Sequence, residues 1–137
     1  MKSLRIAQVM KASPICVGMD TRLQEVRNLL EMHGFHHLPV LDGEELVGII
    51  SDRDILRLLS PFLDTAAEMT RDVELLNKAA HQVMTRQPIC VSLDDSLNKV
   101  IEWMTSASIS CMPVVDEGRL VGIITWRDLV ALLKFDE

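Results

Sequence analysis

The chain has 137 residues, of which 48% are hydrophobic and 25% are charged, and its formal net charge at pH 7 is −6. These proportions are those of an ordinary globular protein and exclude the disordered and fibrous classes. The negative charge argues against a nucleic-acid-binding protein, because a phosphate backbone is bound by a cationic surface.

The sequence matches itself without a gap at an offset of 74 residues (82 − 8), and 22 of the 56 pairs that join residues 8–63 to residues 82–137 are identical. Unrelated segments of ordinary composition would share about three or four identities over this length. The chain therefore contains two copies of one structural unit. We place the copies at residues 1–63 and 83–137, with residues 64–82 as a helical connector between them.

The first copy predicts the order strand, helix, strand, strand, helix. Thr21 and Gln24 have the spacing of a capping box that opens the first helix, and Gly34 ends that helix. A turn-prone segment after the second strand predicts a hairpin, and Ser60 and Pro61 close the last helix. The expected strands are 14–17, 37–41 and 46–51, and the second helix begins near Ser51 or Asp52.

The second copy repeats this order. Its expected strands are 88–91, 112–116 and 120–125, with helices that begin near Asp95 and Trp126. Trp103 is expected in the core, and Trp126 is expected to line a cleft or to cover a dimer surface. The apolar pattern of residues 64–82 predicts a connecting helix with a break near Thr70.

One local motif, hydroxyl-x-x-Asp, follows the last strand of each copy as Ser51 to Asp54 and as Thr125 to Asp128. In a structural interpretation, the hydroxyl residue is a helix N-cap and the acid is favoured by the helix dipole. In a functional interpretation, the aspartate is shorter than the usual Glu or Gln of a capping box and points outwards. It then accepts two hydrogen bonds from a vicinal diol while nearby amides or cations hold a phosphate. Both interpretations stay open.

The chain resembles a tandem pair of CBS domains, also called a Bateman module, in motifs that each occur twice: GIISDRD and GIITWRD, HHLPVLD and CMPVVD, VMKASPICV and VMTRQPICV. The resemblance implies an α+β fold of two β-α-β-β-α repeats, packed through their sheets with pseudo-twofold symmetry. It also implies a homodimer, and clefts between the repeats that bind AMP, ADP, ATP or S-adenosylmethionine. No nucleic acid is expected as a partner.

The resemblance also assigns site residues. Asp54 and Asp128, with Ser51 and Thr125, are the ribose-binding candidates. The adenine pocket comprises Ile15, Cys16, Pro39, Ile89, Cys90, Met112 and Pro113, and the phosphate-binding candidates are His36, His37, Arg53 and Arg127.

The two clefts are expected to differ. The resemblance pairs His36 and His37 with Asp128, and it pairs Ser110 and Cys111 with Asp54. Because the second copy lacks basic residues at this point, the cleft built on Asp54 is either empty or prefers a less charged adenosine compound.

Each cationic candidate has a structural alternative. One histidine of the pair would be exposed and the other partly buried with its hydrogen bonds satisfied. A metal site at His33, His36 and His37 is disfavoured, since the first ends a helix and the others begin a strand. Arg53 and Arg127 have the alternatives of pairing with exposed acids or contacting a dimer partner.

We expect no enzyme, because no nucleophile stands with a base and no HExxH or Walker motif occurs. Two functions remain. The chain is a stand-alone regulatory sensor that binds an adenosine ligand and signals by a conformational shift to an unknown protein target, or it is a ligand-free scaffold that dimerises through its repeats. Neither function requires a cofactor.

The sequence lacks an apolar run of about 18 residues and a signal-peptide core, so we expect a cytoplasmic protein with no membrane partner. Its three cysteines, Cys16, Cys90 and Cys111, are odd in number and form no CxxC pair. We expect buried, reduced thiols, with Cys16 and Cys90 inside apolar strands.

Overall fold

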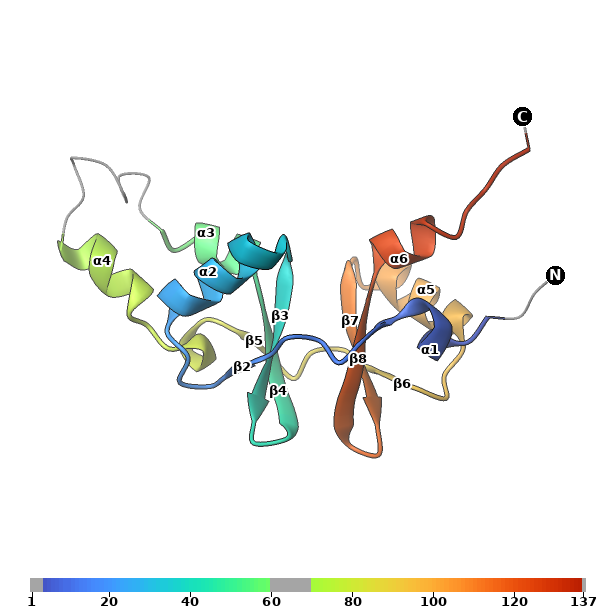
Figure 1. Cartoon of the computed structure of the whole chain (residues 1–137), viewed down its shortest axis with the longest axis horizontal. Helices are drawn as coiled ribbons and strands as arrows, with labels where there is room; N and C mark the ends of the chain where they lie inside the picture. The colour runs from blue at the N-terminus through green and yellow to red at the C-terminus, as the bar shows by residue number, and fades with distance from the viewer. Residues whose placement is uncertain (1–3, 60–69, 137) are drawn as a thin grey trace. The chain divides into compact units, whose positions relative to one another are not determined.

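A computed structural model describes residues 4–59 and 70–136 of the chain. They form two compact units, each built on a four-stranded sheet (Figure 1). Unit 1 holds Met1–Pro14 and Pro88–Glu137, and unit 2 holds Ile15–Gln87. The α+β class and the β-α-β-β-α order of each copy are confirmed. The boundary predicted between residues 63 and 64 lies outside the described residues.

Unit 2 has a sheet of strand order β2-β3-β4-β5, in which β2 and β3 are parallel and the other neighbours are antiparallel. The hairpin of β3 and β4 closes at Asp42, which pairs with Glu45, so the predicted hairpin is confirmed. The elements are β2 (Val17–Gly18), α2 (Leu23–His33), β3 (His37–Asp42), β4 (Glu45–Ser51), α3 (Asp52–Leu56), α4 (Thr70–Leu76), the 3-10 helix η1 (Ala80–Gln82) and β5 (Thr85–Arg86).

Unit 1 has the same design, with strand order β1-β8-β7-β6. The elements are α1 (Ile6–Val9), β1 (Lys11–Ala12), β6 (Val91–Ser92), α5 (Leu97–Ser106), β7 (Cys111–Asp116), β8 (Arg119–Thr125) and α6 (Trp126–Val130). In both units the strand after the Pro-Ile-Cys segment is shorter than expected and begins later in the sequence. The Pro-Ile-Cys segment lies before this strand and not within it.

The core of unit 2 forms where the apolar face of α2 packs on β3. Leu23 and Val26 are 0% exposed and Leu30 is 5% exposed, and they lie in one cluster with Leu38 and Val40 of β3. Each such side chain contributes about 1.5–3 kcal/mol when it is fully buried. In unit 1 the equivalent strand positions, Met112 and Val114, are buried in the same way.

The first segment of each copy completes the sheet of the unit that holds the rest of the other copy. Strand β1 pairs antiparallel with β8, and the 0% exposed Ile6 of α1 lies in the core of unit 1. Strand β5 likewise pairs antiparallel with β4 of unit 2. In Figure 1 the blue helix α1 accordingly lies among the orange elements of unit 1.

A glycine makes each of these edge pairings possible. A Cβ atom on Gly48 would lie 2.4 Å from Met84 Sδ and 2.9 Å from the carbonyl oxygen of Thr85. A Cβ atom on Gly122 would lie 2.4 Å from Met10 Sδ. Since real Cβ atoms do not approach other atoms so closely, the incoming segment fits only against a residue without a side chain.

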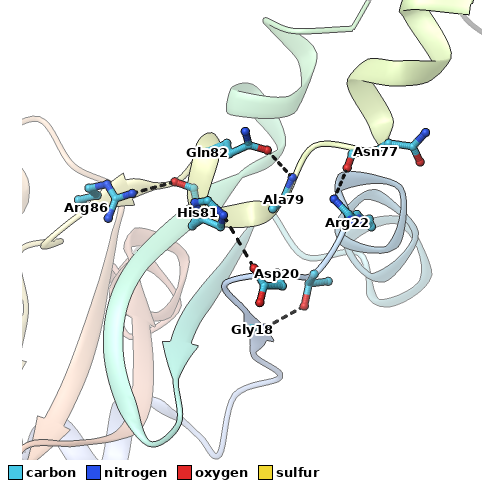
Figure 2. A network of polar contacts seen from close by, with 9 residues as sticks. Gly18, Asp20, Arg22, Asn77, Ala79, His81, Gln82 and Arg86 are labelled. Atoms are coloured by element: carbon cyan, nitrogen blue, oxygen red, sulfur yellow. Dashed lines mark hydrogen bonds and ion pairs between the residues drawn. The ribbon is translucent and has the colours of Figure 1, made fainter.

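The connector is tied to the start of α2 by hydrogen bonds, of which Figure 2 shows the one from the Arg22 side chain to Asn77. The amide of Leu23 donates to the carbonyl of Lys78 over 2.9 Å, and the amide of Ala80 donates to the carbonyl of Thr21 over 2.8 Å. The Arg22 guanidinium adds a 2.8 Å bond to the carbonyl of Asn77. The connector is helical over Thr70–Leu76 and as one turn over Ala80–Gln82, and its residues 64–69 lie outside the described part.

The predicted capping box of Thr21 and Gln24 is wrong. Helix α2 begins at Leu23 with Arg22 as its N-cap, and the Thr21 hydroxyl instead accepts a 2.9 Å hydrogen bond from the amide of Gly18. The physical reason is that the connector carbonyl of Lys78 already satisfies the amide of Leu23. The predicted stop is confirmed, because Gly34 caps the helix in the left-handed conformation with φ 66°.

The structure also differs from the predictions for Trp103 and for the end of α3. Trp103 is 38% exposed and not in the core, because it flanks the side of α5 that packs through Leu97, Val100 and Met104. Helix α3 ends at Leu56, although Leu58 and Leu59 still pack on the core, and the predicted stop at residues 60–61 lies outside the described part.

The three cysteines are free thiols, but Cys16 and Cys90 are only half-buried and precede their strands. Their expected position inside strands is therefore wrong. Burial raises the pKa of both thiols. Burial, with the charge of Asp128, raises the pKa of Cys111 in β7 to about 12, so this thiol is unreactive. Within residues 4–59 and 70–136, no helix is long and apolar enough to cross a membrane.

The close approach at Gly48 can be tested by substitution. Gly48→Ala should destabilise the protein by about 1–3 kcal/mol, because the new methyl group displaces Met84 and the backbone of β5. Urea denaturation followed by circular dichroism measures the change. The matched control is Gly18→Ala, whose Cβ would meet only Thr21 Oγ1 at 3.6 Å. Equal midpoints for the two variants would contradict this role of Gly48.

Candidate functional site

In unit 2 the hydroxyl-x-x-Asp motif forms the junction between β4 and α3. The Ser51 hydroxyl accepts a 3.2 Å hydrogen bond from the amide of Asp54, and Asp54 Oδ2 accepts a 2.9 Å bond from the amide of Ser51. Both residues are half-buried. This reciprocal pair is a capping box, so the N-cap interpretation of the motif is confirmed.

In unit 1 the junction between β8 and α6 is built in nearly the same way. Asp128 Oδ2 accepts a 2.8 Å bond from the amide of Thr125 and a 3.1 Å bond from its hydroxyl. The expectation that the shorter aspartate points outwards instead of closing back on the cap is therefore wrong. The N-cap backbone is extended, with φ −113° and ψ 162° at Ser51 and φ −120° and ψ 165° at Thr125, and it brings its amide within reach.

Each of these carboxylates is anchored through one oxygen only. Over the described ranges, neither Asp54 Oδ1 nor Asp128 Oδ1 takes part in a hydrogen bond or ion pair with the protein. The cap fixes the direction of the carboxylate, and the second oxygen remains an acceptor. The structural and functional interpretations of the motif are therefore compatible.

The predicted phosphate-binding histidines of unit 2 lie beside the same junction. His37 pairs with Ser51 across the hairpin, and the carbonyl of His36 accepts a 3.0 Å bond from the amide of Asp52. His36 Nδ1 also lies 2.8 Å from Asp52 Oδ2, with side-chain exposures of 51% and 41%. His36 is thus the exposed member of the pair and His37 the half-buried one, as the structural alternative requires.

The electrostatics of this cluster separate the two histidines. Burial lowers the pKa of His37, although the charges of Asp52 and Asp54 oppose the shift, so His37 is neutral at pH 7. Partial burial raises the pKa of Asp52, but the hydrogen bond and charge of His36 outweigh it and leave that pKa below its ordinary value. Asp52 is therefore an anion that faces the ring of His36.

Unit 1 keeps the backbone of this junction but changes its side chains. The amide of Trp126 donates a 3.0 Å bond to the carbonyl of Ser110, as Asp52 does to His36. The Arg127 guanidinium lies over the Trp126 ring, 5.6 Å from its centroid. Arg53 and Arg127 are exposed, and within the described residues neither forms the predicted ion pair with an acid.

The predicted adenine-pocket residues fall into two groups. Ile15, Cys16, Ile89 and Cys90 are half-buried and directly precede β2 or β6. Since β2 runs parallel to β3 with Val17 opposite Val40, Ile15 and Cys16 lie beside the start of β3, at the same end as the junction. Pro39, Met112 and Pro113 are buried, and Met112 lies in the core of unit 1.

The disfavoured metal site is not formed. The His33 ring stacks on Phe35 with a centroid distance of 5.2 Å and does not join His36 and His37. No group of three potential metal ligands occurs among the residues that the structure describes.

Sequence reasoning missed the pairing of His36 with Asp52. The signal was present, because both positions differ between the copies: His36 corresponds to Ser110 and Asp52 to Trp126 at the offset of 74. Paired differences between repeats indicate contact, and the two side chains do meet.

Comparisons with known proteins identify the family. The family model for the CBS domain matches residues 6–61 and 80–134. The protein MJ1225 of Methanocaldococcus jannaschii is 36% identical over 111 residues, which are 80% of this chain but 40% of that protein. Its crystal structure, described as a putative archaeal homolog of g-AMPK, superposes with a TM-score of 0.82 at 31% identity over 95% of this chain and 48% of that chain.

Two similar structures contain ligands. The CBS domain pair of protein MJ0100 in complex with 5-methylthioadenosine and S-adenosyl-L-methionine gives a TM-score of 0.78 at 28% identity and covers 96% of both chains. CBSX2 in complex with AMP gives a TM-score of 0.76 at 26% identity and covers 93% of both chains. With two matched repeats that account for most of its length, the chain belongs to the CBS domain family.

Proposed function

We propose that this chain is a regulatory module that binds an adenosine-containing ligand, namely AMP, ADP, ATP or S-adenosylmethionine. The observation that carries the proposal is the half-anchored carboxylate of Asp54 and of Asp128, held by its cap through one oxygen and open at the other. The MJ0100 and CBSX2 complexes support the ligand class, because their CBS pairs bind adenosine compounds.

The carboxylate oxygen that the cap leaves open can accept hydrogen bonds from a ribose. An ionised carboxylate only accepts hydrogen bonds, and a ribose offers two neighbouring hydroxyl donors. Hydrogen bonds to a charged group contribute about 1.5–3 kcal/mol. The oxygen is already directed by the cap, so little side-chain entropy is lost when the ligand binds. Ser51 and Thr125 assist by fixing that direction, each through its main-chain amide and Thr125 also through its hydroxyl.

The remaining contacts follow the sequence resemblance. We propose that the half-buried Ile15, Cys16, Ile89 and Cys90, with the chain around Pro39, Met112 and Pro113, surround the adenine in clefts between the repeats. The phosphate of an anionic ligand would meet His36 and His37 where the ribose is held by Asp128. The Asp54 cleft, opposite Ser110 and Cys111, would then suit a less charged compound. Arg53 and Arg127 are exposed cations near the junctions.

The proposed mechanism is a population shift. A ligand that binds one arrangement of the repeats or protomers better than another raises the population of that arrangement. A protein target then recognises the change in population. The role is regulatory and not catalytic, and the module acts as a homodimer in the cytoplasm. The three free thiols fit a reducing compartment.

A second function, a ligand-free interaction scaffold, is favoured by one observation. Unit 1 exposes several large apolar side chains on α5, on α6 and after it: Ile101, Trp103, Trp126, Val130, Leu132, Leu133 and Phe135. Where such side chains form a contiguous patch, they mark an interaction site. A scaffold would use it to dimerise without any ligand.

A thermal-shift screen separates the two functions. AMP, ADP, ATP and S-adenosylmethionine are each added to the full chain, and a ligand at about 100 times its dissociation constant stabilises the folded state by about 2.7 kcal/mol. We expect at least one compound to raise the melting temperature, with inosine monophosphate as the matched control for the base. The absence of a shift with every compound would favour the scaffold.

The ribose assignment predicts the effect of two isosteric substitutions. Asp128→Asn and Asp54→Asn keep an oxygen for the cap but remove the charge that strengthens the ribose bonds. We expect Asp128→Asn to weaken the binding of the active compound about tenfold by calorimetry, and Asp54→Asn to have the smaller effect, since a change of about 1.4 kcal/mol is tenfold.

The matched control for both variants is Asp116→Asn, which removes the same charge from the turn end of the β7 and β8 hairpin. It should bind like the wild type. Wild-type affinity in both junction variants, with the control also unchanged, would reject the ribose site.

A further inference from the structure

The pair of His36 and Asp52 has no counterpart in unit 1. Both junctions share the main-chain bond of 3.0 Å between the residue before the strand and the first residue of the helix. Only unit 2 adds a side-chain contact to it, the 2.8 Å approach of His36 Nδ1 to Asp52 Oδ2. Unit 1 has Ser110 and Trp126 at these positions, which carry no charge.

The contact fixes which nitrogen of His36 carries the proton. A carboxylate only accepts hydrogen bonds, so Nδ1 must be the donor to Asp52 whether the ring is neutral or protonated. In the neutral ring, Nε2 is then an acceptor. It becomes a donor only when the ring gains a second proton.

The other groups at this end of unit 2 do not replace that donor. Half-buried His37 on β3 is neutral at pH 7, and on α3 the acids Asp52 and Asp54 outnumber the one cation, Arg53. With His36 neutral, these groups sum to one negative charge. Protonation of His36 brings the sum to zero and adds a donor, so it removes repulsion and creates attraction for an anion at one step.

We propose that His36 and Asp52 select, by charge, the ligand of the cleft that contains His36. A phosphate-bearing adenosine compound is accepted when His36 is protonated, and an uncharged or cationic compound is favoured when His36 is neutral. Asp52 is the specificity-determining residue, because it sets the tautomer of His36 and supplies the opposing charge. The inference rests on the proposed adenosine-binding function and deepens it.

The direction of the pH effect follows from proton linkage. The phosphate complex requires one more proton than the free site, so phosphate affinity is highest below the imidazole titration range near about pH 6.5 and falls as the pH rises through it. The affinity for adenosine, which has no phosphate, stays constant. Since a free phosphate itself titrates near about pH 6, the variants must be compared with the wild type at each pH.

The test is calorimetry of AMP and of adenosine with the full chain at about pH 6 and about pH 8, on either side of the ordinary imidazole range. In Asp52→Asn the ring is free to present a protonated Nε2, and one negative charge is gone. We expect its AMP affinity at the higher pH to rise roughly threefold to tenfold, with adenosine affinity changed less than about twofold.

Two further variants complete the design. His36→Gln offers an amide donor at every pH. In this variant the ratio of AMP affinity to adenosine affinity should therefore depend on pH only through the titration of the AMP phosphate. Asp42→Asn removes the same charge from the opposite end of the β3 and β4 hairpin, about 20 Å away at 3.3 Å per residue, and should match the wild type.

The outcomes separate this inference from the function on which it rests. AMP and adenosine binding with wild-type ratios in Asp52→Asn and in His36→Gln would overturn charge selection and leave the adenosine site standing. A rise in AMP affinity in Asp42→Asn equal to that in Asp52→Asn would also overturn it, since net charge alone would then explain the effect. Binding of neither compound would overturn the proposed function and this inference with it.

Discussion

The structure depends on the reciprocal hydrogen bonds that join the last strand of each repeat to its last helix. At Ser51 and Asp54, and at Thr125 and Asp128, the carboxylate accepts the amide of the cap residue and thereby ends the strand and starts the helix. The same bonds hold one carboxylate oxygen and direct the other. A local folding signal and the proposed ribose-binding group are therefore one side chain, and under this proposal a substitution there affects stability and binding together.

Much of the fold could be predicted because the signals are local. The hairpins, the stop at Gly34 and the order of elements follow from turn residues and apolar runs that act over a few positions. The exchange of edge segments could not, because the pairing of Lys11 with Ile123 joins distant parts of the chain. The start of α2 was misplaced for the same reason: the carbonyl of Lys78 supplies what a side-chain cap supplies elsewhere.

In the candidate site, too, the sequence predicted local features but not contacts between distant parts of the chain. The residue types and spacing identified Asp54 and Asp128, but the direction of their carboxylates depends on backbone angles at the cap that no pattern states. The contact of His36 with Asp52 spans 16 residues and appears only when the hairpin brings its ends together. Comparison of the repeats was the more informative guide, because a duplicated fold holds the backbone constant and leaves the differences to function. The junctions agree in their main-chain bonds and differ in charge, which is the property that distinguishes one adenosine ligand from another.

A crystal structure of the full chain with the compound that stabilises it most would show directly whether the two carboxylates bind the ribose. We expect ribose hydroxyl oxygens at about 2.5–3.0 Å from the open oxygen of Asp54 or Asp128, with the cap bonds at Ser51 or Thr125 intact. A ligand bound with its ribose away from both carboxylates, or one that breaks the caps to reach them, would contradict this expectation.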